Sequence, residues 1–233
     1  MEAETEISQE ESQLDSKLLE WASYFLPFQV PLKEKWKEIL LVLNGSSWPV
    51  KSFLKSNARA RGTLHVLELF EGVLLIAPEV VSRSATTRGI FRILLFNDIA
   101  LIQDDADQVS KNFFKDYLLP ILELTEEEIK EIRINAMRIR SLARKITPIK
   151  LTLLVNNQTA GVDGLEQITL SGHNVIRGIQ TLKDRQEVDL KADSIGPWID
   201  IETTSLRFTM GKGILLKEGA SKEVIDVVKS TLA

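Results

Sequence analysis

The sequence predicts an α+β protein, in which N-terminal and central helices over about residues 16–147 precede an antiparallel β region that a C-terminal helix closes. Two observations support this fold class. Thr125-Glu-Glu-Glu128 is a capping box, which starts a helix, and Pro148 would end that helix. After Pro148 the spacing of apolar residues changes from the helical period to the alternation of a strand over residues 149–155. We therefore expect a mainly helical part over 16–147 and a β-rich part over 148–233.

Proline, Asn-Gly and N-cap residues delimit the helices that we expect in the first part. They cover residues 16–26, 32–43 and 48–55, a stretch around 110–120 capped by Asp107 or Ser110 and ended or kinked by Pro120, and residues 125–146. Residues 61–104 fit strand and buried-helix patterns alike, and helix is slightly favoured because apolar residues fall on every face. A hairpin turning at Asn97-Asp98 is the alternative there.

Turn-forming residues divide the second part into short strands. We expect strands at residues 149–155, 167–170, 175–182, 187–190 and 198–201, and an antiparallel hairpin over residues 206–216. Ser221 is the expected N-cap of the last helix, whose Val224, Val227, Val228 and Leu232 share one face. A meander or small barrel closed by that helix fits this order.

The composition excludes several kinds of chemistry. The 233 residues contain no cysteine, so disulfides, thiolate nucleophiles and cysteine-ligated metals are excluded. The two histidines, His65 and His173, lie far apart in the chain, and neither has a partner visible in the sequence. We therefore identify no catalytic residue, no metal ligand and no cofactor site.

Charge and hydropathy indicate where the protein resides. The net charge is −4, and acidic residues are concentrated in residues 1–15, which we expect to form a disordered tail. The N-terminus lacks the basic start and apolar core of a targeting signal, and no apolar run approaches the roughly 20 residues of a membrane span. We expect an intracellular protein, in the cytoplasm.

The strongest candidate binding site is a run of basic side chains near the end of the 125–147 helix. It contains Arg133, Arg138, Arg140, Arg144, Lys145 and Lys150, with no acidic residue between 133 and 150. Guanidinium groups suit phosphates, so this segment could bind RNA, DNA or another phosphate-bearing ligand. The helix dipole alone also favours basic residues late in a helix. A second basic cluster comprises Lys51, Lys55, Arg59 and Arg61.

Residues 91–98, Phe-Arg-Ile-Leu-Leu-Phe-Asn-Asp, resemble the "LFND" strand of pleckstrin-homology domains in exchange factors. The following residues are acidic and then helical in pattern, where that family continues with strands. The resemblance covers these few residues, and it implies no function for the chain.

Three functional hypotheses follow. The first is a non-enzymatic interaction or assembly protein, acting through protein–protein contacts and self-association of its aromatic-faced helices or its β edge. The alternative is nucleic-acid binding through the basic end of the 125–147 helix. The second alternative is a cysteine-free, metal-independent enzyme that uses carboxylates.

Overall fold

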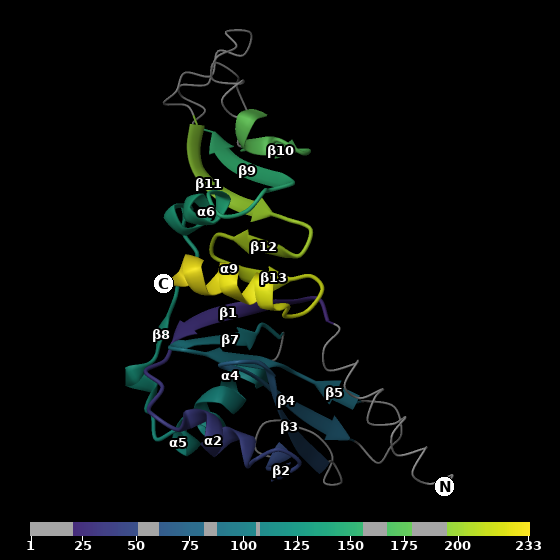
Figure 1. Cartoon of the computed structure of the whole chain (residues 1–233), viewed down its shortest axis with the longest axis vertical. Coiled ribbons are helices and arrows are strands. Elements are labelled where there is room, and N and C mark those ends of the chain that lie inside the picture. The colour runs from purple at the N-terminus through teal and green to yellow at the C-terminus, as the bar shows by residue number, and fades with distance from the viewer. Residues whose placement is uncertain (1–20, 51–60, 82–87, 106–107, 156–166, 179–194) are drawn as a thin grey trace, which may run out of the picture. The chain divides into compact units, whose positions relative to one another are not determined.

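The computed structural model describes residues 21–50, 61–81, 88–105, 108–155, 167–178 and 195–233. These residues form two compact units, Tyr24–Ile132 and Arg133–Ala233, with residues 21–23 grouped with the latter. Each unit contains an antiparallel β-sheet and short helices (Figure 1).

The first unit contains one antiparallel sheet. Its strands follow the spatial order β1 (Ser23–Gln29), β7 (Ile99–Gln103), β6 (Ile93–Phe96), β4 (Val73–Val81), β3 (Arg61–Phe70) and β2 (Ser47–Trp48). Two further short strands lie off this order: β5 (Arg88–Ile90) pairs with β4, and β8 (Lys130–Glu131) pairs with β1. Residues with positive φ form the two hairpin turns, Gly72 at 74° and Asn97 at 51°.

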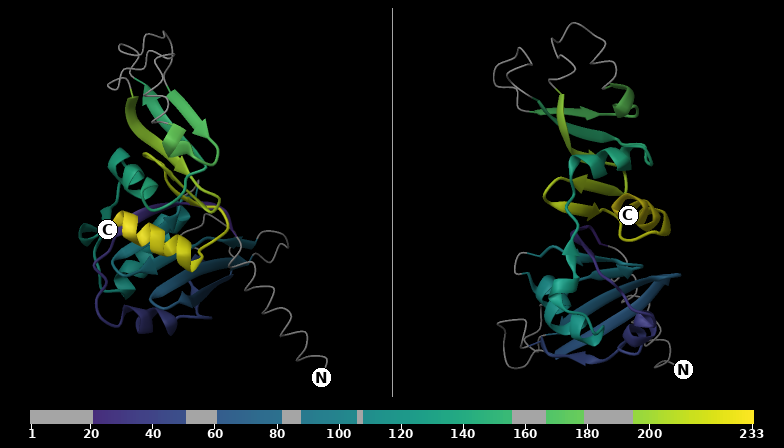
Figure 2. Two further views of the ribbon diagram at one scale, coloured as in Figure 1. Left: turned by 45° about the horizontal axis from the view of Figure 1, so that its top comes forward. Right: turned by 90° about the vertical axis from the view of Figure 1, so that its left-hand side faces the viewer.

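Helices cover one face of this sheet (Figure 2). A continuous helical stretch runs through α4 (Val109–Phe113), the π-helix η1 (Phe114–Leu118) and α5 (Leu119–Ile121), and α2 (Trp36–Leu41) adds Leu40. The indole of Trp48 meets the rings of Phe91 and Phe113 edge-on, with centroid distances of 5.9 and 5.1 Å. Such edge-to-face contacts contribute beyond the burial of area alone.

The second unit begins with α6 (Ala136–Ala143) and ends with α9 (Lys222–Leu232). Its sheet has the order β10 (Gln167–Ser171), β9 (Lys150–Val155), β11 (Ile195–Glu202), β12 (Leu206–Thr209) and β13 (Gly213–Leu216). Helix α6 packs on β11 and on α9 (Figure 2). The core of this unit includes Leu151, Leu153, Ile201, Phe208, Ile214, Ile139, Leu142, Ile225 and Val228.

The predicted fold class is wrong. The chain is mostly antiparallel β-sheet with short helices, and strands fill residues 61–81 and much of 88–103, where helix was favoured. The hairpin that turns at Asn97-Asp98, the alternative, is the one present. The cause is that Val73–Val80 and β6 are buried on both faces. Such strands read as continuous apolar runs without alternation.

The first predicted helix is also wrong, because residues 23–29 form β1. Pro27 lies within this strand, and its carbonyl oxygen accepts a hydrogen bond from the Ile132 N–H at 2.8 Å. Residues 16–20 and the acidic tail lie outside the described residues, as does most of the predicted 48–55 helix, whose Trp48 belongs to strand β2. The helix predicted over 32–43 is confirmed in shorter form as α2.

The helix expected over 125–146 is replaced by two shorter ones. The capping box is confirmed, but it caps only the 3₁₀ turn η2 (Glu126–Glu128), and Ile129 is extended. The chain then adds β8 to β1, and Asn135 starts α6 by accepting the Arg138 N–H at 3.0 Å. Strand pairing with a distant segment therefore outweighs local helix propensity.

The other predictions from sequence can be judged where residues are described. The helix around 110–120 is confirmed, although the carboxylate of Asp105 caps it. Strands β9, β10 and β11, the 206–216 hairpin and the Ser221-capped last helix are confirmed. Residues 175–178 are helical where a strand was predicted, and 179–194 lie outside the described residues. No described helix has the length and apolar character needed to span a bilayer.

Candidate functional site

Two of the predicted basic residues contact the end of α9. Arg138 donates from Nη2 to the carbonyl oxygen of Leu232 at 3.1 Å, and Lys145 Nζ donates to the carbonyl of Ser230. The last carbonyls of a helix have no partner within the helix and carry the negative end of its dipole. Arg138 and Lys145 therefore stabilise the C-terminus of α9.

A third basic residue, Arg140, lies over the indole of Trp198, 5.7 Å from the ring centroid. A β-bulge between Trp198 and Asp200 makes this contact possible. Trp198 pairs with Leu153 on the face that α6 covers, and Asp200 pairs with Thr152 on the opposite face. Without the bulge, Trp198 and Asp200 would share one face, because they are two positions apart in the strand.

The remaining members of the basic segment are Arg133, Arg144 and Lys150. Arg133 and Arg144 are exposed, and Lys150 is half-buried on β9, opposite Ser171 on one side and Glu202 on the other. Of the second basic cluster, Lys51, Lys55 and Arg59 lie outside the described residues. Three of the six predicted phosphate-binding residues, Arg138, Arg140 and Lys145, thus contact other residues of the second unit.

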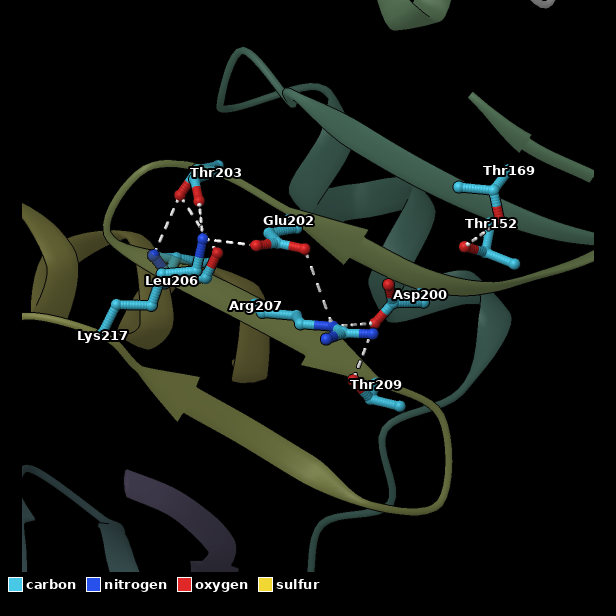
Figure 3. Close-up of polar contacts among 9 residues, drawn as sticks. All are labelled: Thr152, Thr169, Asp200, Glu202, Thr203, Leu206, Arg207, Thr209 and Lys217. Atoms are coloured by element: carbon cyan, nitrogen blue, oxygen red, sulfur yellow. Dashed lines mark hydrogen bonds and ion pairs between the residues drawn. The ribbon is translucent and has the colours of Figure 1, made fainter. Parts of the chain in front are cut away.

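The sheet face opposite α6 carries a row of polar side chains across four strands. Thr169, Thr152, Asp200 and Thr209 are successive partners on β10, β9, β11 and β12. The hydroxyl oxygens of Thr152 and Thr169 are 3.0 Å apart, and Thr209 donates to Asp200 Oδ1 at 2.7 Å (Figure 3). These contacts fix the register of the sheet as far as its outer strand.

A chain of ion pairs runs beside this row (Figure 3). Arg207 Nε lies 2.7 Å from Asp200 Oδ1 and 4.0 Å from Glu202 Oε2. Lys217 Nζ binds Glu202 Oε1 at 2.5 Å and donates to the Thr203 carbonyl at 2.6 Å. Charges alternate in sign along this chain, so it links β11, β12 and the end of β13 without excess charge.

Asp200 is the most buried member of the network, with 6% of its side chain exposed. Its Oδ1 accepts hydrogen bonds from Arg207 and Thr209, whereas Oδ2 is buried without a partner among the described residues. The bonds to Oδ1 offset part of the cost of burying this carboxylate.

Strand β10 ends the sheet, because β9 is its only neighbour in the part of the chain that the structure describes. The Gly172 N–H donates to the Ile149 carbonyl at 2.9 Å, in line with the β9–β10 register. Since hydrogen-bonded and open pairs alternate, Ile168 and Leu170 bond to β9. The N–H and C=O groups of Gln167, Thr169 and Ser171 therefore point away from the sheet.

A small pocket of about 160 Å³ lies where the end of the basic segment meets the turn after β10. It is lined by Ile146, Thr147, Pro148, His173, Asn174, Val175, Ile176 and Arg177. The sequence placed His173 in a turn without a partner, and it gave no signal that residues 146–148 and 173–177 adjoin. Their proximity follows from the pairing of β9 with β10.

The first unit also contains a histidine–carboxylate pair that the sequence did not predict. His65 Nε2 lies 3.1 Å from Glu79 Oε2, and both side chains are largely buried. The residues come from β3 and β4, in which His65 pairs with Ala77 and Glu79 with Thr63. If the sequence had predicted the hairpin that turns at Gly72, the pairing of β3 with β4 would have placed His65 close to Glu79. Among the described residues, no three histidine or acidic side chains gather as a metal site would require.

No protein-family model matches the chain, and no curated protein matches it.

Proposed function

We propose that this chain is a non-enzymatic assembly protein whose copies associate through the outer edge of β10. The observation that carries the proposal is the composition and geometry of this strand, Gln-Ile-Thr-Leu-Ser over residues 167–171. It contains no charge, proline or bulge, which are the features that normally protect an edge strand from pairing. Its outward backbone groups are suited to antiparallel addition of another strand.

The edge is self-complementary about a two-fold axis through Thr169. Antiparallel pairing there joins Thr169 with Thr169 of a second copy, and Gln167 with Ser171. Each of these pairs exchanges two backbone hydrogen bonds. A closed two-fold contact of this kind uses the same patch on both copies.

The same arrangement extends the apolar core. Ile168 and Leu170, both partly exposed, pair with the core residues Leu153 and Leu151. About the two-fold axis, Ile168 of one copy lies opposite Leu170 of the other, so the apolar face continues across the junction. The Thr152–Thr169 hydroxyl contact continues on the opposite face.

The expected affinity is modest. Each backbone hydrogen bond contributes about 0.5–1.5 kcal/mol net, whereas association costs about 4–15 kcal/mol in lost freedom. Burial of Ile168 and Leu170 supplies about 25 cal/mol per Å² of apolar surface. Because these terms largely offset one another, we expect a weak contact, with a dissociation constant on the order of 1–100 μM.

Thr169→Pro tests the edge directly, with Thr169→Val as its matched control. Proline removes an N–H that β9 does not use and places its ring toward the second copy, which an edge strand tolerates. Valine removes the hydroxyl but keeps the N–H. Light scattering and sedimentation over concentrations from about 1 to 500 μM, spanning the expected affinity, measure the mass of each protein.

The wild-type mass should rise from one chain towards two, Thr169→Val should behave similarly, and Thr169→Pro should remain at one chain. A wild-type mass of one chain throughout would overturn the proposal. This holds even if β10 binds a strand of a different protein, because the proposed contact is between two copies of this chain. Association of Thr169→Pro equal to the wild type would also overturn it, because the contact would then lie elsewhere.

The nucleic-acid alternative has less support. It requires a set of accessible cations, and Arg138 and Lys145 bond to α9 carbonyls while Arg140 lies over Trp198. For the enzyme alternative, the His65–Glu79 pair is the nearest arrangement to an acid–base site among the described residues. It has no described nucleophile within hydrogen-bond distance of the histidine, so no reaction is derived from it.

A further inference from the structure

The outward face of α6 is basic and has an exposed apolar residue at its start. Met137, Arg140 and Arg144 are spaced three and four positions apart, so they share one side of the helix. The buried Ile139 and Leu142 occupy the opposite side. Met137 is 75% exposed, and both arginines are exposed as well. These three side chains therefore point away from the core of the second unit.

Two further exposed residues lie at the start of α6. Arg133 precedes the helix and is exposed. Met210, which is 39% exposed, belongs to the turn between β12 and β13. The next residue, Gly211, donates its N–H to the Ile134 carbonyl at 3.3 Å, which brings this turn to the start of the helix. We call the set of Arg133, Met137, Arg140, Arg144 and Met210 the basic face.

The arginines of the basic face are accessible. Among the described residues, the side chains of Arg133 and Arg144 have no hydrogen bond or ion pair. Arg140 lies over the indole of Trp198 but is still exposed. The sequence has no acidic residue between 133 and 150. The positive charge of this face is therefore not neutralised by carboxylates of its own segment.

The chain itself contains a segment of opposite charge. Residues 2–15, which lie outside the described residues, contain six acidic side chains and no lysine or arginine. Two isolated apolar residues, Ile7 and Leu14, lie among these acids. Residues 21–23, a few positions later, are grouped with the second unit. A short connection thus tethers the acidic segment to the unit that carries α6.

We infer that residues 2–15 dock on the basic face of α6 in the same chain. The carboxylates pair with the three arginines through charge-assisted hydrogen bonds, and an apolar side chain of the segment covers Met137. Exposed ion pairs are individually weak. The tether offsets this weakness, because it gives the segment an effective concentration on the order of 1 mM at the face. The inference does not rest on the proposed self-association through β10.

An acidic peptide suits this face better than a nucleic-acid backbone does. Binding to a backbone grows with the number of phosphates that are neutralised, so it needs a longer row of cations. Arg138 and Lys145, which would lengthen the row, donate to carbonyl groups of α9. The exposed thioether chain of Met137 also matches an apolar side chain and has no counterpart on a phosphate backbone.

Paramagnetic relaxation measured by NMR in the full chain tests the docking. The chain has no cysteine, so Ser8→Cys provides a single site for a spin label within the acidic segment without changing its charge. At low salt the label should broaden the amide signals of α6 more than those of β10, because α6 packs on β11 and β9 lies between β11 and β10. In 1 M NaCl, where the Debye length falls to about 3 Å, this difference should disappear.

Arg133→Gln combined with Arg144→Gln removes two cations of the basic face. Lys35→Gln combined with Lys222→Gln removes two exposed cations elsewhere and is the matched control for charge. The arginine pair should reduce the broadening of α6 about threefold or more, from the loss of two exposed ion pairs. The lysine pair should leave it unchanged. Circular dichroism establishes that both double variants are folded.

Equal broadening of α6 and β10 at low salt would overturn the inference. Selective broadening of α6 that survives 1 M NaCl or the loss of both arginines would do so too, because the contact would then not depend on these charges. An oligonucleotide that shifts the α6 signals of a chain whose label leaves them unbroadened would instead assign the face to a nucleic acid.

A mixture of spin-labelled chains with isotope-enriched, unlabelled chains separates docking within one chain from docking between copies. The α6 signals should remain sharp in this mixture, and broadening there would overturn the assignment to one chain. Spin-labelled Thr169→Pro should keep the broadening of α6, since the docking needs no second copy. Loss of self-association and loss of docking are therefore distinguishable results.

Discussion

The indole of Trp48 lies directly against the α-carbon of Gly62, its partner across the β2–β3 pair. A Cβ atom at Gly62 would come within 2.5 Å of the indole nitrogen and 2.4 Å of Val50 Cγ2. The close approach allows the indole N–H to donate to the Glu79 carbonyl at 3.2 Å. Glycine is therefore required here for space.

Gly62→Ala should destabilise the protein by about 1–3 kcal/mol, because the added methyl group must displace Trp48 from its contacts with Phe91 and Phe113. Urea denaturation followed by circular dichroism measures this loss. Gly178→Ala is the matched control, since an added Cβ there meets no atom within 4 Å. Equal midpoints for Gly62→Ala and the wild type would contradict the packing described.

Arg138→Met should destabilise the second unit by about 1 kcal/mol, because it removes the hydrogen bond to the Leu232 carbonyl at the end of α9. Arg144→Met removes the same charge from the same segment at an exposed position and should have little effect. Thermal unfolding of both variants makes the comparison. Equal losses would mean that net charge, and not the contact with α9, sets the stability.

The β-rich second part could be predicted because one face of its sheet is apolar and the other polar. Leu151 and Leu153 alternate with Lys150 and Thr152, so the sequence displays the period of a strand. Ser221 is a true N-cap, with its Oγ 3.3 Å from the Val224 N–H. Signals that depend on neighbours in the sequence were reliable there.

The sheet of the first unit could not be predicted in the same way. Val73–Val80 and β6 are buried throughout, and the residues that they pair with lie on other strands. Their sequences therefore show no alternation of apolar and polar residues. The 125–146 region failed for a related reason. Local signals favour a helix, but residues 130–131 pair with β1, about 100 positions earlier.

The candidate sites depend still more on non-local geometry. All six residues of the basic segment were visible in the sequence, but the contacts of Arg138 and Lys145 with α9 and of Arg140 with Trp198 were not. Asp200 shares a face with Thr152 only because of the bulge after Trp198. The pocket needs His173 and Arg177 beside residues 146–148, a placement set by the register of β9 and β10.

The capping box should make stability depend on acidic pH. The Thr125 backbone N–H, and then its hydroxyl, hold the pKa of Glu128 below its ordinary value of 4.5. A carboxyl whose pKa is lower in the folded state stabilises above its unfolded-state pKa, and this contribution is lost as pH falls through the folded-state pKa. Glu128→Gln should therefore be less stable than the wild type at pH 7, and the difference should shrink below pH 4.5.

Urea denaturation at a series of pH values measures that difference. Glu127→Gln, an exposed neighbour in the same turn, controls for the loss of one negative charge. A deficit in Glu128→Gln that stays constant from pH 7 to well below 4.5 would show that the carboxylate bond is not its cause.

The last prediction concerns the ion pair of the buried Asp200 and the partly exposed Arg207. A double-mutant cycle with Asp200→Asn and Arg207→Gln should give a coupling free energy of about 1–2 kcal/mol, because Arg207 donates to Oδ1 at 2.7 Å and the carboxylate is almost fully buried. The partial exposure of Arg207 keeps the value below that of a fully buried pair.

Lys222→Gln, at an exposed position on α9, supplies the matched cycle. Its effect should add to that of Asp200→Asn within about 0.5 kcal/mol, as for sites without shared partners. If the Asp200–Arg207 cycle is equally additive, the ion pair does not hold β11 to β12. The register of the sheet, which has β10 at its edge, would then be set by the apolar face that contains Ile201 and Phe208.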